Sequence, residues 1–250
     1  MKNGFSPISS PDVDILPSIC DGEAGAGRTG QKLFVLGGRR PDSAWLHEFV
    51  RMNDLGVWAI DSGVAACRAA GLRPSVIVGD RDSATSGDWQ WAVSAGAVEH
   101  LHNPDKDRTD FQLALNLLHE RGESPILTGG FGGRTDHFLS ILWTFYGTAK
   151  RAEMPKKPRC MIDHEEGLFF LHNSESAMLL FKRRPVAVSL LSMSKRCSGV
   201  SISGVRWPLS NVELRRNFPW SISNETAVDG KPVVVSCGDG VLGISWCYFG

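Results

Sequence analysis

The chain has 250 residues, of which 42% are hydrophobic and 22% are charged, so it can bury one large core or two smaller ones. Its formal net charge is zero, which excludes an overall basic field for nucleic acid or an anionic membrane surface. It has no early apolar run, no apolar stretch of about 18 residues and no Cys-x-x-Cys pair, so we expect a cytoplasmic protein with reduced thiols and no membrane span.

The composition and the hydrophobic periodicity of the chain change after residue 31. Residues 1–31 are rich in Ser, Pro, Gly and Asp without periodicity, and they are predicted to form a flexible N-terminal arm. Between residues 32 and 150, helical spacing alternates with five apolar runs of strand length: Leu33–Leu36, Val57–Ile60, Ser75–Val78, Val98–His102 and Pro125–Thr128. The helical spacing is clearest in two sets of residues: Phe111, Ala114, Leu115 and Leu118, and Phe138, Ile141, Leu142 and Phe145.

This alternation predicts a Rossmann-like, three-layer α/β domain with a mostly parallel sheet over residues 32–150. In such a sheet, ligands bind beyond the carboxyl ends of the strands. A proline-rich and cationic linker is expected near residues 150–158. Residues 159–250 then carry short apolar segments separated by turn residues, which predicts an antiparallel β-sandwich.

Two aspartates follow the apolar run that ends at Val78, in the sequence Gly79-Asp80-Arg81-Asp82-Ser83. Carboxylates at the end of a buried strand could hold magnesium against phosphate oxygens, because Mg²⁺ prefers hard oxygen ligands. Taken alone, an Asp-x-Asp pair more often caps a helix or forms a turn. Asp61 follows the preceding predicted strand and would lie at the same edge of the sheet.

A second acidic cluster, from Asp105 to Asp110, includes Lys106 and Asp107. Thr109 and Gln112 match a capping box, which predicts a helix that begins at Asp110. Asp110 would then lie in the first helical turn, where the macrodipole favours an anion, so a purely helix-stabilising role competes with metal binding. Lys106 could contact a phosphate or be solvated.

Four glycines occupy five positions in Gly129-Gly130-Phe131-Gly132-Gly133, between a predicted strand and a predicted helix. Such a loop lets backbone amides approach phosphate or a sugar, although the spacing matches neither the dinucleotide fingerprint nor a P-loop. Arg134 could bind phosphate through its forked guanidinium. His137 could act as a general base, but a histidine in the first turn of a helix is more often structural.

A further group of candidates lies in the carboxy-terminal half, around Trp207 and in the segment from Ser221 to Asn224. The face of Trp207 could stack on a flat or cationic ring. The serines and the asparagine could form hydrogen bonds with a heterocycle. A core tryptophan beside a polar turn would produce the same pattern.

Taken in this order, the motifs resemble those of the thiamine pyrophosphokinase family. The resemblance covers residues from about 33 to 250, and its matching stretches are Asp61-Ser62-Gly63, Gly79–Ser83, Asp105–Phe111, Gly132–His137, Ser203–Leu209 and Ser223-Asn224-Glu225. The chain departs from the family in its N-terminal arm and at Ser62, where the family usually has glycine. The resemblance implies an α/β nucleotide-binding domain and a β-sandwich thiamine-binding domain. It also implies a homodimer whose sites lie between the α/β domain of one subunit and the sandwich of the other.

The resemblance further implies magnesium-dependent transfer of a pyrophosphoryl group from ATP to the hydroxyl of thiamine, which gives thiamine diphosphate and AMP. It places Asp80, Asp82 and Asp110 on magnesium and Asp136 in the reaction centre. The implied ATP-binding residues are Asp61, Lys106, Asp107, Arg134 and His137, and the implied thiamine-binding residues are Trp207, Ser221, Ser223 and Asn224. Asp82 and Asp136 are alternative groups for orienting the thiamine hydroxyl or accepting its proton.

Two other functions remain open at this point. The protein could be a pyrophosphokinase that acts on another small alcohol, such as a hydroxymethyl pterin. It could also be a non-catalytic sensor of nucleotide or thiamine on the same scaffold. Competition between thiamine and pterin alcohols would separate the first alternative, and ligand binding without AMP release would support the second.

Overall fold

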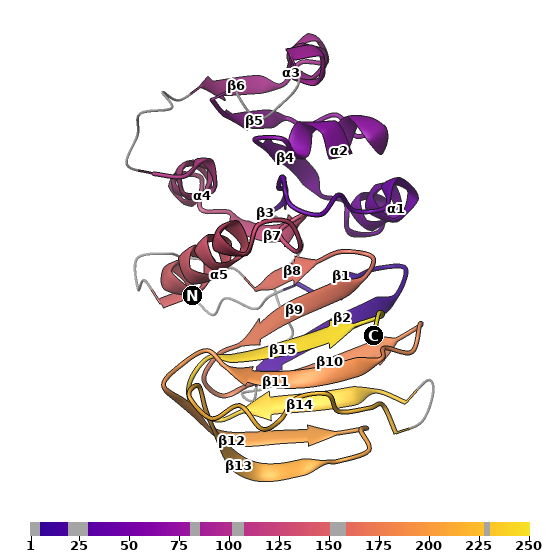
Figure 1. Cartoon of the computed structure of the whole chain (residues 1–250), viewed down its shortest axis with the longest axis vertical. Helices are drawn as coiled ribbons and strands as arrows, with labels where there is room; N and C mark the ends of the chain where they lie inside the picture. Colours follow the sequence, from indigo (N-terminus) through magenta and orange to yellow (C-terminus); the bar gives the residue numbers. More distant parts are fainter. Residues whose placement is uncertain (1–5, 20–29, 81–85, 102–107, 151–158, 228–230) are drawn as a thin grey trace. The chain divides into compact units, whose positions relative to one another are not determined.

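The computed structural model describes residues 6–19, 30–80, 86–101, 108–150, 159–227 and 231–250. They belong to two compact units, whose elements are labelled in Figure 1. One unit is the contiguous stretch Thr29–His164, which we call the α/β unit. The other combines Met1–Arg28 with Glu165–Gly250, and we call it the sandwich unit.

Within the described part of the α/β unit, six strands lie side by side in the order β8-β7-β3-β4-β5-β6. All neighbouring pairs are parallel, which confirms the predicted parallel sheet. The strands are β3 Gln31–Val35, β4 Gly56–Ile60, β5 Val76–Gly79, β6 Val98–Leu101, β7 Ser124–Thr128 and β8 Cys160–Ile162. The helices between them are α1 Ser43–Asn53, α2 Gly63–Ala69, α3 Ser86–Ser94, α4 Asp110–Glu120 and α5 Thr135–Lys150.

The core of the α/β unit lies on both sides of its sheet. Every residue of β5 and β7 is buried, as expected for parallel strands covered on two faces. Phe34 of β3 stacks on Trp58 of β4 with ring centroids 5.3 Å apart, and Phe111 of α4 meets Phe34 edge-on. The predicted apolar face of α4 is confirmed, because Phe111, Ala114, Leu115 and Leu118 are all buried. Each large side chain buried in this way contributes about 1.5–3 kcal/mol.

Helix α5 is also present where its spacing predicted it, but its apolar residues are less well covered. Phe138, Ile141 and Leu142 are half-buried, and Trp143 is 61% exposed. None of the described helices has both the length and the apolar character needed to cross a membrane.

The sandwich unit contains two sets of antiparallel strands. Their orders are β1-β2-β10-β14-β12-β13 and β11-β15-β9. The strands are β1 Ile8–Ser9, β2 Val13–Ile19, β9 Glu166–Leu171, β10 Glu175–Phe181, β11 Ala187–Ser192, β12 Arg196–Ser203, β13 Leu209–Arg215, β14 Val233–Cys237 and β15 Leu242–Cys247. Strand β11 shows why these segments form a sandwich. Its buried and half-buried residues alternate, so that Val188 and Leu190 point into the core.

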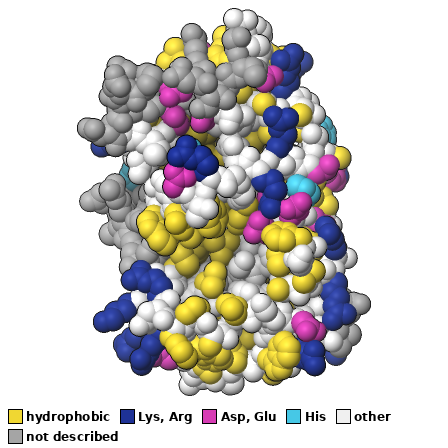
Figure 2. Space-filling model, viewed as in Figure 1, with side chains coloured by type: hydrophobic (Ala, Val, Ile, Leu, Met, Phe, Trp, Pro, Cys, Tyr) yellow, Lys and Arg dark blue, Asp and Glu magenta, His cyan; other side chains and the backbone are white. Residues whose placement is uncertain are grey.

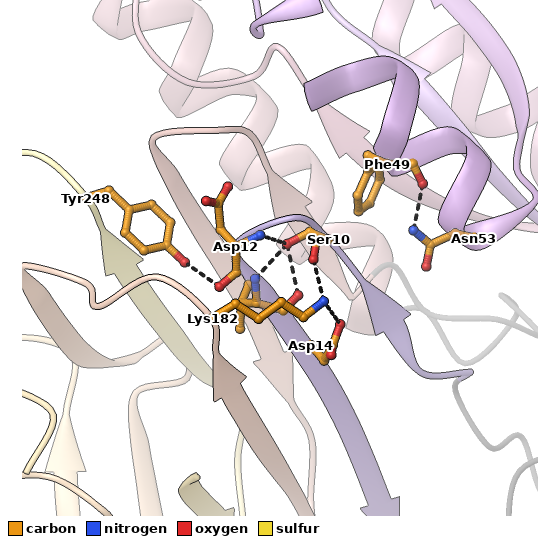
Figure 3. A network of polar contacts seen from close by, with 8 residues as sticks. Ser10, Asp12, Asp14, Phe49, Asn53, Lys182 and Tyr248 are labelled. Carbon is orange, nitrogen blue, oxygen red and sulfur yellow. Dashed lines mark hydrogen bonds and ion pairs between the residues drawn. The ribbon is translucent and has the colours of Figure 1, made fainter. Parts of the chain in front are cut away.

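The amino-terminal segment differs from the flexible arm expected from the sequence. Strand β2 pairs with β10 along its length, and its Val13 and Ile15 are fully buried. The Lys182 ammonium donates to the Ser10 carbonyl at 2.8 Å and pairs with Asp14 at 2.7 Å (Figure 3). The arm prediction is therefore wrong for residues 8–19. The alternating apolar side chains of β2 find their partners in a strand that lies far along the chain.

The domain boundary differs as well. We expected the sandwich domain to begin at residue 159, but β8 pairs with β7 and belongs to the α/β unit, which ends at His164. Strand β8 is short, apolar and fully buried. The sequence alone therefore does not show whether it is the last strand of the parallel sheet or the first strand of the sandwich.

Candidate active site

The strand order of the α/β unit reverses between β3 and β7. The chain starts in the middle of the sheet at β3, proceeds through β4 and β5 to β6, and then returns to the other side with β7 and β8. Such a switch point leaves a crevice beyond the carboxyl ends of the two central strands, where open α/β sheets bind their ligands. Both loops that leave this switch point are rich in glycine: Gly37-Gly38 follows β3, and Gly129–Gly133 follows β7.

Main-chain hydrogen bonds join these two loops. The Gly38 amide donates to the Gly129 carbonyl at 2.7 Å, and the Arg39 amide donates to the Phe131 carbonyl at 2.6 Å. A Cβ atom on Gly38 would lie 2.6 Å from the Gly129 oxygen, so a larger residue would force the loops apart. Gly129 has a φ of 67°, a conformation that L side chains rarely adopt. The two loops therefore form a glycine cradle, by which we mean residues 37–39 and 129–133 together.

An ion pair with one buried partner holds the cradle in place. The Arg39 guanidinium lies 2.8 Å from Asp163, whose side chain is fully buried just after β8. Two hydrogen bonds reach the same carboxylate oxygen, one from Nε and one from Nη2 of Arg39. Loss of the Arg39 guanidinium would remove a charge partner from the buried Asp163 carboxylate, which is unfavourable. Arg39 is therefore a support for the loop after β3.

The turn after β4 shows how the chain accommodates Ser62, where the resemblance noted above leads us to expect glycine. Asp61 carries the positive φ of this turn, 56°, whereas Ser62 has a φ of −65° and needs no glycine. The requirement for glycine falls on Gly63, whose α-carbon packs against the Val35 carbonyl so closely that any Cβ would collide with it. The Ser62 hydroxyl lies against Gly37, at the rim of the glycine cradle.

Two of the predicted metal ligands lie in neighbouring elements of the α/β unit. Asp80 directly follows β5, Asp110 is the first residue of α4, and α4 packs against β5. Both side chains are half-buried. Thr109 caps α4 with the predicted capping box, so Asp110 stands in the first turn, where the helix dipole favours a carboxylate.

The remaining predicted members of this cluster, Asp82, Lys106 and Asp107, lie outside the described residues. Within the described ranges, no three side chains of His, Cys, Asp or Glu gather closely enough to hold a metal ion. The chemistry of Asp80 and Asp110 nevertheless suits magnesium, because both offer hard carboxylate oxygens and remain partly open to water.

Arg134 and Asp136 form an exposed pair at the start of α5. The guanidinium makes two hydrogen bonds to the carboxylate, from Nε at 3.1 Å and from Nη2 at 2.6 Å. This contact with Arg134 lowers the pKa of Asp136 below its ordinary value, so the carboxylate is ionised near neutral pH. The His137 amide also donates to Asp136, and the His137 side chain itself is exposed. The Arg134 guanidinium is well exposed and is held against Asp136.

In the sandwich unit, the predicted thiamine-binding residues fall into two groups. Trp207 is 51% exposed and Ser223 is exposed, so both side chains can meet a ligand. Ser221 and Asn224 are buried, at 8% and 7% exposure. The Asn224 side chain is hydrogen-bonded to the main chain of Trp207, which brings two of the predicted residues into direct contact.

A cavity of about 430 Å³ opens beside the hairpin that carries Trp207. Its lining combines serine hydroxyls with apolar side chains: Ser201, Ile202, Ser203, Pro208, Leu209, Ser210, Val234 and Ser236. No charged side chain lines it, so it suits an uncharged part of a ligand.

Comparison with known proteins identifies the family. A family model described as thiamin pyrophosphokinase, catalytic domain, matches residues 49–155. A second, described as thiamin pyrophosphokinase, vitamin B1 binding domain, matches residues 180–242. The two matches follow each other in one chain and together cover more than half of it. The chain belongs to the thiamine pyrophosphokinase family. It is thus a member of a family of enzymes whose common activity is the pyrophosphorylation of thiamine.

Individual relatives agree with this assignment. The chain is 27% identical over 170 residues to a thiamine pyrophosphokinase of Bacillus subtilis strain 168, a match that covers 66% of this chain and 76% of the relative. A crystal structure of thiamine pyrophosphokinase from Bacillus subtilis superposes with a TM-score of 0.73 at 21% identity, covering 88% of this chain and 99% of that one. Thiamin pyrophosphokinase from Candida albicans gives a TM-score of 0.70 at 15% identity, with 87% and 89% covered. These structural matches establish a shared fold.

Several residues of the site in this thiamine pyrophosphokinase family member were not singled out from the sequence. They are Gly37, Gly38, Arg39 and Asp163 around the cradle, whereas Arg206 and Glu225 lay within the quoted stretches without being given a role. The pair Gly37-Gly38 directly after an apolar run was a usable signal, because a predicted strand followed by glycines suggests a ligand loop. Asp163 left no local signal, since its partner Arg39 lies 124 residues away.

Proposed function

We propose that the protein transfers a pyrophosphoryl group from ATP to the hydroxyl of thiamine, with magnesium as cofactor, and releases thiamine diphosphate and AMP. One observation carries this proposal: a single chain contains a match to the catalytic model and a match to the vitamin B1 binding model of the family, in that order. The carboxylates after β5 and at the start of α4, together with the glycine cradle, supply the chemistry that the nucleotide half of the reaction needs.

On the nucleotide side, Asp80, Asp82 and Asp110 would hold magnesium on the triphosphate. The bound metal would neutralise phosphate charge and stabilise the departing AMP. The cradle supplies main-chain groups at the switch point, and its glycines permit close approach of phosphate. Arg134 would contact a phosphate through its guanidinium. Asp61, Lys106, Asp107 and His137 complete the proposed ATP-binding set.

The reaction joins the thiamine hydroxyl oxygen to the β-phosphorus of ATP and breaks the bond from that phosphorus to the oxygen bridging to the α-phosphate. The β- and γ-phosphates move together, AMP leaves with the bridging oxygen, and the hydroxyl loses its proton. Such a transfer depends mainly on alignment and on charge stabilisation. Because its pairing with Arg134 lowers the pKa of Asp136, this carboxylate is a weak proton acceptor. We therefore propose that Asp136 orients Arg134 and that Asp82, held on magnesium, orients the hydroxyl.

On the acceptor side, Trp207, Ser221, Ser223 and Asn224 form the proposed thiamine-binding set. The exposed indole offers a face for the cationic thiazolium, a contact worth about 1–2 kcal/mol when water is excluded. The exposed hydroxyl of Ser223 can hydrogen-bond the ligand directly. Ser221 contributes through its carbonyl, which accepts a hydrogen bond from the Leu190 amide at 2.7 Å and so anchors the segment to β11.

The test is a product assay. Purified protein, ATP, magnesium and thiamine are mixed, and AMP and thiamine diphosphate are separated by chromatography. Asp80→Asn is expected to lower kcat by about 100-fold to 1000-fold, because it removes charge that stabilises the transition state. Asp54→Asn is the matched control: Asp54 is an exposed C-cap of α1 with a φ of 51°, which asparagine also adopts, so activity is expected to be unchanged.

Absence of both products from folded wild-type protein would contradict the proposal. Parallel reactions with a hydroxymethyl pterin distinguish the acceptor, since pyrophosphorylation of the pterin alone would assign a different substrate. Equal rates for wild type and Asp80→Asn would remove the metal role of Asp80. Removal of magnesium with a chelator is expected to stop the reaction, and restored magnesium is expected to restart it.

We also propose a cytoplasmic homodimer in which each site takes residues from two subunits. The support for this is the family resemblance. Light scattering on the purified protein would give its mass, and a monomeric mass in fully active protein would contradict the shared site. Cell fractionation would test the proposed compartment.

A further inference from the structure

Three hydrogen bonds join the side chain of Asn224 to main-chain groups. Its Nδ2 donates to the Trp207 carbonyl at 2.7 Å, and its Oδ1 accepts from the Trp207 amide at 3.1 Å and from the Glu225 amide at 3.0 Å. An asparagine oxygen has two lone pairs, and both are used here. Asn224 is also 7% exposed. Its amide thus pairs with the backbone of Trp207 much as a neighbouring strand would.

The backbone of Asn224 is anchored in turn to the core of the sandwich unit. Its amide donates to the Val188 carbonyl at 2.9 Å, and its carbonyl accepts from the Val188 amide at 2.7 Å. Val188 lies in β11 and is fully buried. The Asn224 side chain therefore links the main chain of Trp207 to a buried strand, beside the main-chain bond that the Arg206 amide donates to the Glu225 carbonyl at 2.8 Å.

The indole ring is held separately, by Arg206. The guanidinium carbon lies 4.7 Å from the centroid of the Trp207 ring, within the range of a cation–π contact. Arg206 pairs with Glu225 at 3.3 Å, so a carboxylate accompanies the positive charge beside the indole. The ring is still 51% exposed. One face is thus occupied by the guanidinium, and the opposite face is the one that a ligand can reach.

We propose that Asn224 is a positioning residue, which fixes Trp207 so that the indole face opposite Arg206 receives the flat cationic ring of the acceptor. This inference rests on the proposed function, and it changes the role given to Asn224 there. Asn224 acts on the acceptor only through Trp207, while the acceptor contacts the indole and Ser223. Arg206 and Glu225 keep the second face of the indole covered, so that a single ring is bound.

A double-mutant cycle tests this role. KM for thiamine and KM for ATP are measured for wild type, Asn224→Ala, Trp207→Ala and the double variant. Each single variant is expected to raise KM for thiamine about tenfold and to leave KM for ATP unchanged, since it removes one stacking contact. The double variant is expected to match Trp207→Ala, because Asn224 has nothing left to position. If the two effects multiply instead, Asn224 contacts the acceptor itself and the positioning role is overturned.

Asn173→Ala serves as the matched control. Its side-chain oxygen also accepts a main-chain hydrogen bond within the sandwich unit, from the Gly240 amide at 2.8 Å, but it has no contact with the Trp207 segment among the described residues. KM for thiamine is expected to be unchanged in this variant. An equal rise in the control would show that any lost turn contact has the same effect, and would overturn the proposal.

Folding failure and functional failure can be told apart. If Asn224→Ala does not fold, Asn224→Asp replaces it in the cycle, because aspartate keeps the acceptor for the Trp207 amide, loses the donor to its carbonyl and adds a negative charge at this buried site. A multiplicative cycle in protein that makes thiamine diphosphate overturns the positioning role alone. Wild-type protein that neither binds nor converts thiamine overturns the proposed function and this inference together.

Discussion

The two units differ in how the chain assembles them. The α/β unit is one uninterrupted stretch, whereas the sandwich unit joins both ends of the sequence. In the α/β unit, candidate ligand groups stand directly at strand ends, as main-chain atoms of glycine loops and as aspartates one residue beyond β4 and β5. In the sandwich unit, Trp207 is held by residues that follow it by 17 and more positions, and strand β2 comes from the far end of the chain. A site made from backbone leaves a local signature in the sequence, and a site made from long-range side-chain contacts does not.

The largest expected effect tests whether the sandwich unit truly needs the amino-terminal strand. Ile15 is fully buried in β2, so Ile15→Ala is expected to lower the free energy of unfolding by about 2–5 kcal/mol. Leu16, the next residue, is 37% exposed on the other face, and Leu16→Ala is expected to cost less than about 1 kcal/mol. Urea unfolding of the full chain measures both. If Ile15→Ala unfolds at the same urea concentration as the wild type, β2 is dispensable. The contrast between the two units would then lose its basis.

The same contrast explains which parts of the structure could be predicted from the sequence. The strands from β3 to β7, the cap of α4 and the buried face of α4 all follow from short-range patterns, and all are confirmed. Strand β2 was missed, although Val13 and Ile15 flank the polar Asp14 at strand spacing, because Pro17 and the surrounding Ser, Pro and Asp residues resemble a coil. The contacts that join Trp207 to Asn224 and Asn224 to Val188 could not be predicted, because only the folded chain brings these three residues together.

The backbone-built character of the glycine cradle can be tested with two matched glycines. Gly129 and Gly122 have φ values of 67° and 66°, so alanine at either position pays the same conformational cost of about 1–2 kcal/mol. A Cβ on Gly122 meets open space, whereas one on Gly129 collides with the Leu36 carbonyl. Gly129→Ala is therefore expected to cost about 1–3 kcal/mol more than Gly122→Ala in urea unfolding. It is also expected to raise KM for ATP, and equal behaviour of the two variants would contradict the close approach of the loops.

A coupled pair at the rim of the cradle sharpens the comparison further. Gly37 has no Cβ where the Ser62 hydroxyl lies, so Gly37→Ala is expected to cost about 1–3 kcal/mol by overpacking. After Ser62→Gly, the nearest remaining atom of residue 62 is its amide nitrogen, 3.7 Å from the added Cβ, which is an ordinary contact. The double variant is expected to regain most of the lost stability. Additive losses in the cycle would show that serine at position 62 and glycine at position 37 are independent.

The smallest expected effect concerns Asp136, an exposed side chain at the start of α5. Because its pairing with Arg134 lowers its pKa, Asp136 contributes to stability while ionised, and this contribution is lost as the pH falls through the pKa of the folded state. Both partners are well exposed, so Asp136→Asn is expected to leave the unfolding midpoint at neutral pH nearly unchanged.

The informative measurement for Asp136 is the pH profile of kcat/KM for ATP. If Asp136 orients Arg134, Asp136→Asn lowers kcat/KM by the same factor at every pH from about 5 to about 9, because the carboxylate stays ionised throughout that range. If Asp136 instead accepts the proton of the thiamine hydroxyl with a pKa near neutrality, the acid limb of the wild-type profile disappears in the variant. Loss of the acid limb in Asp136→Asn would identify Asp136 as the proton acceptor. It would contradict the roles proposed for Asp136 and Asp82.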